Sequence, residues 1–311
     1  MAFTALDVKA LRETTGCGML DCKKALMETD GDMDKAIDFL REKGLAAVAK
    51  KSSRIAAEGA VLADYCQESK VGAVIEVNSE TDFAAKSDKF LAFVKVCLKA
   101  VMEQNPADVD ALLACNVEGR TLQQILQDNV LVIGENLKIR RFVRYEGACA
   151  SYVHMGGKIG VLVRFDADVA DKDGFAEYGK DIAMQIAASQ PLYICPKGVP
   201  ESVLEHEKEV ALVQINEDPK MASKPDAVKE KMLEGKIGKY YKENCLISQA
   251  FIKDPDIDVE AYTAKVAKEL GGSIKIAEFV RFEKGEGLEK KAEENLADEV
   301  AKQIAQAQKK D

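Results

Sequence analysis

The sequence is poor in the residues that build metal sites and disulfide frameworks. Its 311 residues include two histidines, His154 and His206, and eight cysteines, none of which form a Cys-x-x-Cys pair. The spacings of zinc fingers and redox motifs are therefore missing. Cysteines this sparse are typical of reduced thiols that pack as small apolar side chains. We expect a chain without disulfides that binds neither a metal nor a cofactor.

Long apolar runs and an excess of basic charge are missing as well. No apolar run approaches the roughly 18 residues that would span a bilayer, and the first residues lack the pattern of a signal or transit peptide. Lysine and arginine number 44 against 53 acidic residues, a net charge of −9, which argues against binding nucleic acid through bulk charge. We expect a cytoplasmic protein of two or three compact units that binds no membrane and no nucleic acid directly.

Known catalytic motifs are also missing. The sequence contains no Gly-x-x-x-x-Gly-Lys-Ser/Thr phosphate loop, no Gly-x-Ser-x-Gly elbow and no His-Glu-x-x-His helix. Its closest approach to a phosphate cradle is His154-Met155-Gly156-Gly157-Lys158, which lies between two expected strands, where a hairpin turn is the simpler interpretation. Active sites also assemble from distant residues, so an enzyme stays an alternative, but we expect none.

Residues 1–55 are predicted to form a small three-helix unit. Apolar residues recur at helical spacing, most clearly in the third helix, and glycine-containing loops separate the three segments. The pattern resembles ubiquitin-associated (UBA) domains, which are docking modules. We expect Asp7 to cap the first helix, Gly31-Asp32 to begin the third, Gly44 to end it, and Lys50–Arg54 to form an exposed basic connector.

From Glu58 onward the sequence repeats itself. Each copy has two strands, then a helix, then a closing strand; the matching segments are 58–77 and 146–165, 88–102 and 174–189, and 137–146 and 274–283. The closing strands alternate apolar and charged residues in places, as half-exposed antiparallel strands do. We therefore predict an α+β fold with a duplicated core, in which each half is an antiparallel sheet covered on one face by helices.

The second copy is longer because it contains an insertion. Val199, Val203, His206, Val210 and Val213 step by four and three residues, a heptad pattern that breaks near Pro219 and gives way to a second helix after Pro225. This pattern predicts an antiparallel helical hairpin, a coiled coil, with His206 on its seam or at the seam's edge.

After Gly287 comes one more amphipathic helix, with Leu296, Val300 and Ile304 on one stripe. It could fold back on its own core or lie on a partner. Taken together, we expect a UBA-like unit over 1–55, core subdomain N over 56–146, core subdomain C over 147–195 and 240–284, the inserted hairpin over 196–239, and a C-terminal helical module over 285–311.

Between the second strand and the helix of the first copy stands Thr81-Asp82-Phe83. A Phe at the start of a helix usually points into the core. The alternative is that Phe83 points outward as an anchor for another protein, with the Asp82 carboxylate beside it.

Two motifs carry a resemblance to a known family. Thr15–Leu26, TGCGMLDCKKAL, and Glu76–Lys86, EVNSETDFAAK, resemble the signatures of bacterial translation elongation factor Ts, and the order of the segments is similar over essentially the whole chain. The family acts as guanine-nucleotide exchange factor for the GTPase elongation factor Tu. Its hairpin is a distinct dimerisation or coiled-coil element, so the resemblance also implies a homodimer as one option.

The resemblance implies roles for particular residues. In the family, the Thr-Asp-Phe turn inserts between two helices of the GTPase and displaces the elements that hold Mg²⁺. Phe83 would then be an outward wedge, Asp82 its polar companion, and Thr81 and Ala84 would complete the segment. His154 is similar to a family histidine that packs near the nucleotide site, although Met155 interrupts the usual turn. The three-helix unit and the C-terminal helix are expected to make further contacts with the GTPase.

The main alternative from another class is a UBA-type scaffold or docking protein without exchange activity. The three-helix unit alone suggests it. That reading leaves the duplicated core and the Thr-Asp-Phe turn unexplained.

Overall fold

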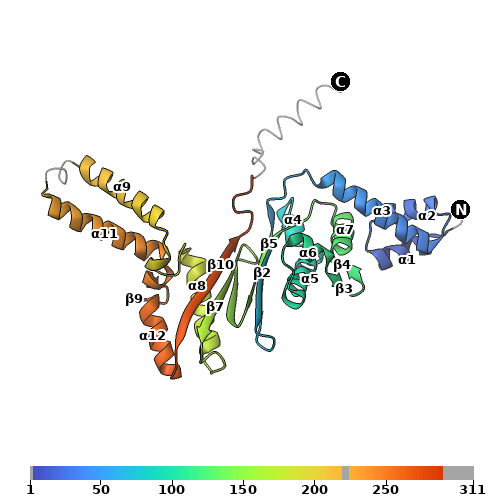
Figure 1. Ribbon diagram of the computed structural model, residues 1–311. Helices are drawn as coiled ribbons and strands as arrows, with labels where there is room; N and C mark the ends of the chain where they lie inside the picture. Colours follow the sequence, from blue (N-terminus) through green and yellow to red (C-terminus); the bar gives the residue numbers. More distant parts are fainter. Residues whose placement is uncertain (1–2, 219–223, 290–311) are drawn as a thin grey trace.

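The structure, a computed structural model, describes residues 3–218 and 224–289, and of residues 45–50 the backbone alone. Two three-stranded antiparallel sheets lie at its centre, with the three-helix unit at one end and the inserted hairpin at the other (Figure 1). The predicted α+β fold class is confirmed. The C-terminal helix predicted around Leu296, Val300 and Ile304 lies outside the described residues.

The N-terminal unit consists of α1 (Ala5–Thr15), α2 (Met19–Glu28) and α3 (Met33–Lys51). Asp32 accepts a hydrogen bond from the Lys35 N–H, which confirms it as the cap of α3. The prediction that Asp7 caps α1 was wrong. Thr4 is the N-cap, and Asp7 is the third residue of the helix, where its carboxylate accepts the Thr4 N–H in a capping box.

The prediction that Gly44 ends α3 was wrong as well. The helix continues to Lys51 because Gly44 faces α7 (Leu122–Ile133), where an added Cβ would lie 3.4 Å from the Gln127 carbonyl oxygen. A glycine in a helix interior lowers helix propensity, but here it lets two backbones approach closely. The basic connector is consequently shorter than expected, since Lys50 and Lys51 belong to the helix.

The two copies of the repeat form two matching sheets. In the first, β1 (Glu58–Cys66), β2 (Val71–Ser79) and β5 (Lys138–Glu146) lie in the order β1-β2-β5; in the second, β6 (Ala148–His154), β7 (Ile159–Ala167) and β10 (Ile274–Glu283) lie in the order β6-β7-β10. Both closing strands carry a bulge at the matching position, Arg140 in β5 and Ala277 in β10. The duplicated core with antiparallel sheets is thus confirmed.

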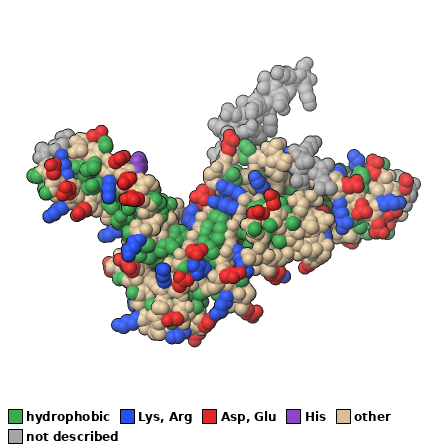
Figure 2. Space-filling model, in the orientation of Figure 1, with side chains coloured by type: hydrophobic (Ala, Val, Ile, Leu, Met, Phe, Trp, Pro, Cys, Tyr) green, Lys and Arg blue, Asp and Glu red, His purple; other side chains and the backbone are tan. Residues whose placement is uncertain are grey.

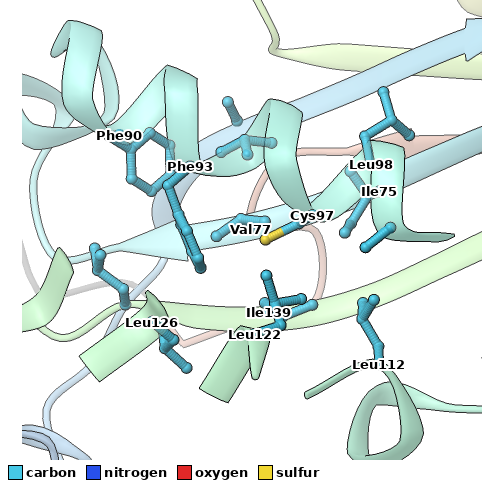
Figure 3. Packing of buried hydrophobic residues seen from close by; sticks show 14 of the residues in the cluster. Ile75, Val77, Phe90, Phe93, Cys97, Leu98, Leu112, Leu122, Leu126 and Ile139 are labelled. Atoms are coloured by element: carbon cyan, nitrogen blue, oxygen red, sulfur yellow. The ribbon is translucent and has the colours of Figure 1, made fainter. Parts of the chain in front are cut away.

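Helices cover one face of each sheet. On the first sheet, α5 (Asp88–Gln104) and α7 bury apolar side chains against the strands, and Figure 3 shows Phe93 and Cys97 of α5 beside Val77 and Ile139. On the second, α8 (Phe175–Ser189) and α12 (Val259–Leu270) do the same. All eight cysteines lie within the described residues and are free. Five are buried, as the predicted packing role requires (Cys17, Cys22, Cys97, Cys149 and Cys245), and three are half-buried.

The other faces of the two sheets pack against each other. Val61, Val74, Cys149 and Leu162 form a buried cluster between them. Matching glycines make the approach possible: a Cβ added at Gly72 would lie 2.7 Å from Leu162 Cδ1, and one added at Gly160 would lie 2.4 Å from Val61 Cγ1. The two halves therefore meet through an approximate twofold relation.

Short elements connect the larger ones. They are α4 (Asp82–Ala85), α6 (Val109–Ala114), β3 (Asn116–Val117), β4 (Arg120–Thr121), the 3₁₀ turns Pro196–Gly198 and Leu246–Ser248, β8 (Ala250–Phe251) and β9 (Asp254–Asp258).

The insertion is an antiparallel hairpin of α9 (Glu201–Glu217) and α11 (Asp226–Asn244), as predicted. The predicted seam was right at its start, where Val199 is buried and Val203 half-buried, and wrong from His206 onward. His206, Val210 and Val213 are exposed, and the buried residues of α9 are Ala211 and Ile215. The inward row of α9 steps by four residues, since Ala211 and Ile215 lie about one helical turn apart. The valines on the outer row are left facing solvent, and Figure 2 shows apolar side chains among charged ones on the hairpin.

Candidate functional site

The Thr-Asp-Phe motif lies where β2 ends and the helices of the first copy begin. Thr81 is the N-cap of α4, and its hydroxyl accepts the Ala84 N–H at 3.2 Å. Lys86 ends this single turn, and Ser87 caps α5 in the same way as Thr81 caps α4. We call Thr81–Ala84 the Phe83 turn. Two caps within seven residues force a sharp corner, and the residues between them form its outer surface.

Phe83 points outward. Its side chain is 85% exposed, whereas Ala84 behind it is buried. Asp82 stands beside the ring and pairs with Lys86 Nζ at 2.7 Å, a hydrogen bond that lowers the pKa of its carboxyl. The turn therefore presents an apolar ring next to a charged carboxylate, while Ala84 faces the interior.

The backbone of the turn is braced by Glu135, a residue that no sequence pattern singles out. Glu135 Oε2 accepts the N–H groups of Glu80 and Thr81 at 3.0 Å each, and Oε1 accepts the Thr81 hydroxyl. Glu135 follows the left-handed Gly134 that ends α7. Its only sequence signal is that glycine, which predicts the end of a helix and says nothing about a partner 54 residues earlier.

His154 occupies the turn between β6 and β7. It is exposed, and its Nδ1 lies 3.0 Å from the Tyr152 hydroxyl. The predicted hairpin turn is confirmed, with Met155, Gly156 and Gly157 all at positive φ. Glycine adopts this left-handed backbone conformation without steric cost, whereas the side chain of methionine disfavours it.

The structure brings the two predicted contact regions to one end of the core. The Gly157 carbonyl accepts the Val61 N–H at 2.8 Å, which attaches the His154 turn to the first residues of β1. Glu58, at the start of β1, pairs with Ser79, two residues before the Phe83 turn. Both turns therefore flank the beginning of β1.

The site is a protrusion and not a pocket. A cleft of about 750 Å³ does exist, but it lies at the opposite end of β1, lined by Leu62, Cys66, Val71, Leu98 and Met102 among others. Within residues 3–218 and 224–289, no three His, Cys, Asp or Glu side chains are grouped to hold a metal ion. Small ligands bind in concave sites, so an exposed aromatic on a braced corner is better suited to anchoring in another protein.

None of the helices in the described part of the chain is long and apolar enough to cross a membrane.

Replacing Glu135 with Ala is expected to loosen the turn while the fold stays intact. Without the carboxylate, the amides of Glu80 and Thr81 should exchange with solvent about tenfold faster, the equivalent of roughly 1.4 kcal/mol of lost hydrogen bonding. Native-state hydrogen exchange measures this, with Glu205→Ala on the exposed face of α9 as control. Unchanged exchange at both amides would show that Glu135 does not brace the turn.

Comparisons with known proteins identify the family. A family model described as "Elongation factor TS" matches residues 80–286. Relatives named elongation factor Ts include those of Trichlorobacter lovleyi (47% identical over 310 residues, 97% of this chain and 98% of the relative) and Clostridioides difficile (47% over 305 residues, 97% and 98%). That of Clostridium botulinum strain Alaska E43 is 46% identical over 306 residues, 97% of this chain and 99% of the relative. The chain belongs to the elongation factor Ts family.

Proposed function

We propose that the chain carries out its family's role, guanine-nucleotide exchange on elongation factor Tu, by inserting the Phe83 turn into the GTPase. Phe83 acts as the wedge, Asp82 is its polar companion, Thr81 fixes the corner and Ala84 forms its base. The supporting observation is the 85% exposure of Phe83 on a backbone held by Glu135. The scaffold alternative is not favoured by membership of this family.

The physical reason for a braced corner is preorganisation. Ordering a flexible loop on binding lowers affinity, and rigidity in the bound conformation removes that cost. Aromatic anchors that fill a partner's pocket contribute much of the energy in many interfaces. Because the cap and Glu135 hold the backbone before binding, the free energy of burying the ring is available to deform the GTPase.

The exchange reaction follows from linkage. Mg²⁺ neutralises phosphate charge, so GDP and the ion bind the GTPase cooperatively. A factor that binds the Mg²⁺-free state more tightly must weaken nucleotide binding, and by reciprocity nucleotide must weaken binding of the factor. The direction of exchange is then set by the excess of GTP. No catalytic group is required, and we infer that this cytoplasmic chain neither binds nucleotide nor turns it over by itself.

Further contacts extend the interface. His154 lies at the same end of the core as the Phe83 turn and packs on the GTPase beside it. On the three-helix unit, Leu6, Leu20 and Met27 are exposed apolar side chains, which supports its role as a docking module. In this proposal the chain is divided into residues 1–55, a two-part core, a hairpin and a C-terminal module, and each contact is made by a separate unit.

Replacing Phe83 with Ala is expected to slow the release of fluorescent GDP from elongation factor Tu at least thirtyfold relative to wild type, since truncating an aromatic anchor removes about 2 kcal/mol or more. The melting temperature should not change, because the ring is solvent-exposed in the free protein.

Two controls accompany this variant. Phe83→Leu should keep part of the activity, and Leu192→Ala, which removes another exposed apolar side chain, should keep all of it. If Phe83→Ala releases GDP as fast as wild type, the wedge role is wrong although exchange stands.

We also propose that two copies associate through the hairpin. Val210, Leu212, Val213 and Val228 are exposed on α9 and α11, and an apolar surface of this kind favours self-association. In sedimentation experiments at micromolar concentration, wild type should move as a dimer and Val213→Glu as a monomer. Glu205→Gln on the same helix is the control. Identical behaviour of wild type and Val213→Glu would contradict the proposal.

A further inference from the structure

Glu76 is a buried carboxylate whose surroundings are unusual for its strand. It lies in the middle of β2 with no exposed surface. Arg140 Nη1 and Arg141 Nε donate to it at 3.0 Å and 2.7 Å, and the Gly285 N–H donates at 2.8 Å. Burial acts to raise the pKa of Glu76, but these hydrogen bonds outweigh it and leave the pKa below its ordinary value of 4.5. The side chain is therefore charged at neutral pH.

The fold itself does not require this buried charge, as the second copy shows. The position that matches Glu76 is Arg164, and the position that matches Arg141 is Glu278. These two also pair, at 2.9 Å, but with the charges reversed and on the surface. The bulge residue that matches Arg140 is Ala277. The same strands and the same bulge are thus built without a buried carboxylate, and burying one is costly.

In the first copy, Glu76 and its two arginines form hydrogen bonds with the segment that follows β10. Besides the Gly285 N–H, Arg140 donates to the Glu286 carbonyl and Arg141 to the Glu286 carboxylate at 3.1 Å. Gly285 is left-handed and passes so close to the Ala57 carbonyl that a side chain would overlap it. Segment Lys284–Gly287 therefore crosses the start of the first sheet. A hydrogen bond from Gly285 connects it to Glu76, which lies 209 positions earlier in the sequence.

The same carboxylate also holds the strand that leads to the Phe83 turn. The Asn78 amide donates to Glu76 at 3.1 Å and to the Glu58 carbonyl at 3.0 Å. Glu58 pairs with Ser79 and forms an ion pair with Lys284. Glu76, Asn78 and Glu58 thus connect the last residues before Thr81 to the residues after β10.

We propose that Glu76 is a positioning residue for nucleotide exchange, which fixes the Phe83 turn and segment Lys284–Gly287 in one relative placement. Two parts of the chain that are remote in sequence then meet the GTPase as one surface. This inference rests on the function proposed above.

A double-mutant cycle tests it. The GDP-release rate of elongation factor Tu is measured with wild type, Glu76→Gln, Phe83→Ala and the double variant, and the melting temperature of each is recorded. We expect Glu76→Gln to slow release about tenfold in the presence of Phe83 and less than about twofold in its absence, since residues that act through one contact are not additive. A residue that only stabilises the fold would slow release by the same factor in both backgrounds.

A second variant guards against a folding defect in Glu76→Gln. Arg140→Ala introduces the residue that the second copy carries at this bulge, and it leaves Glu76 paired with Arg141. It should lower the release rate in the same non-additive way. Arg164→Gln, at the matching position of the second copy, is the control and should behave as wild type.

The outcomes are distinguishable. If wild type itself fails to accelerate release, the proposed function fails. If wild type and Phe83→Ala behave as proposed, but Glu76→Gln and Arg140→Ala match wild type or are additive with Phe83→Ala, the positioning role alone is overturned.

Discussion

The close approach of the two sheets is the constraint on which the rest of the structure depends. Gly72 and Gly160 occupy matching positions and leave room for the side chains of the opposite copy. Because the sheets meet face to face, their helices must lie on the outer faces, and the turns at one end of each copy come together. The placement of the Phe83 turn beside the His154 turn is a consequence of that packing.

The site itself combines an exposed side chain with a fixed backbone. An exposed Phe is unfavourable for the free protein, since its ring stays in water. The structure keeps it outward because Ala84 occupies the inward position and Glu135 satisfies the amides before the helix. The neighbouring Asp82 carboxylate is held by Lys86. The backbone of the corner is therefore already fixed in the free protein.

Much of this architecture could be predicted from the sequence because its signals are local or repeated. The duplication predicted both sheets, and Pro225 and Asp32 predicted where helices begin. Gly44 led to a wrong prediction of the end of α3, because its role depends on α7, which is remote in sequence. The hairpin seam was mispredicted after Val203, because valines mark an apolar face but do not show which row of residues packs against α11. Glu135 and Glu76 could not be assigned, since a carboxylate acquires such a role only through partners that the fold brings to it.

We propose that Phe83 promotes exchange by displacing the elements that hold Mg²⁺ in elongation factor Tu. The most direct measurement is the ratio of GDP-release rates with wild type and with Phe83→Ala, taken across a range of free Mg²⁺ concentrations. We expect a large ratio at millimolar Mg²⁺ that shrinks toward one when the ion is chelated, because the wedge then has nothing left to displace. A ratio that stays constant as Mg²⁺ is removed would contradict it.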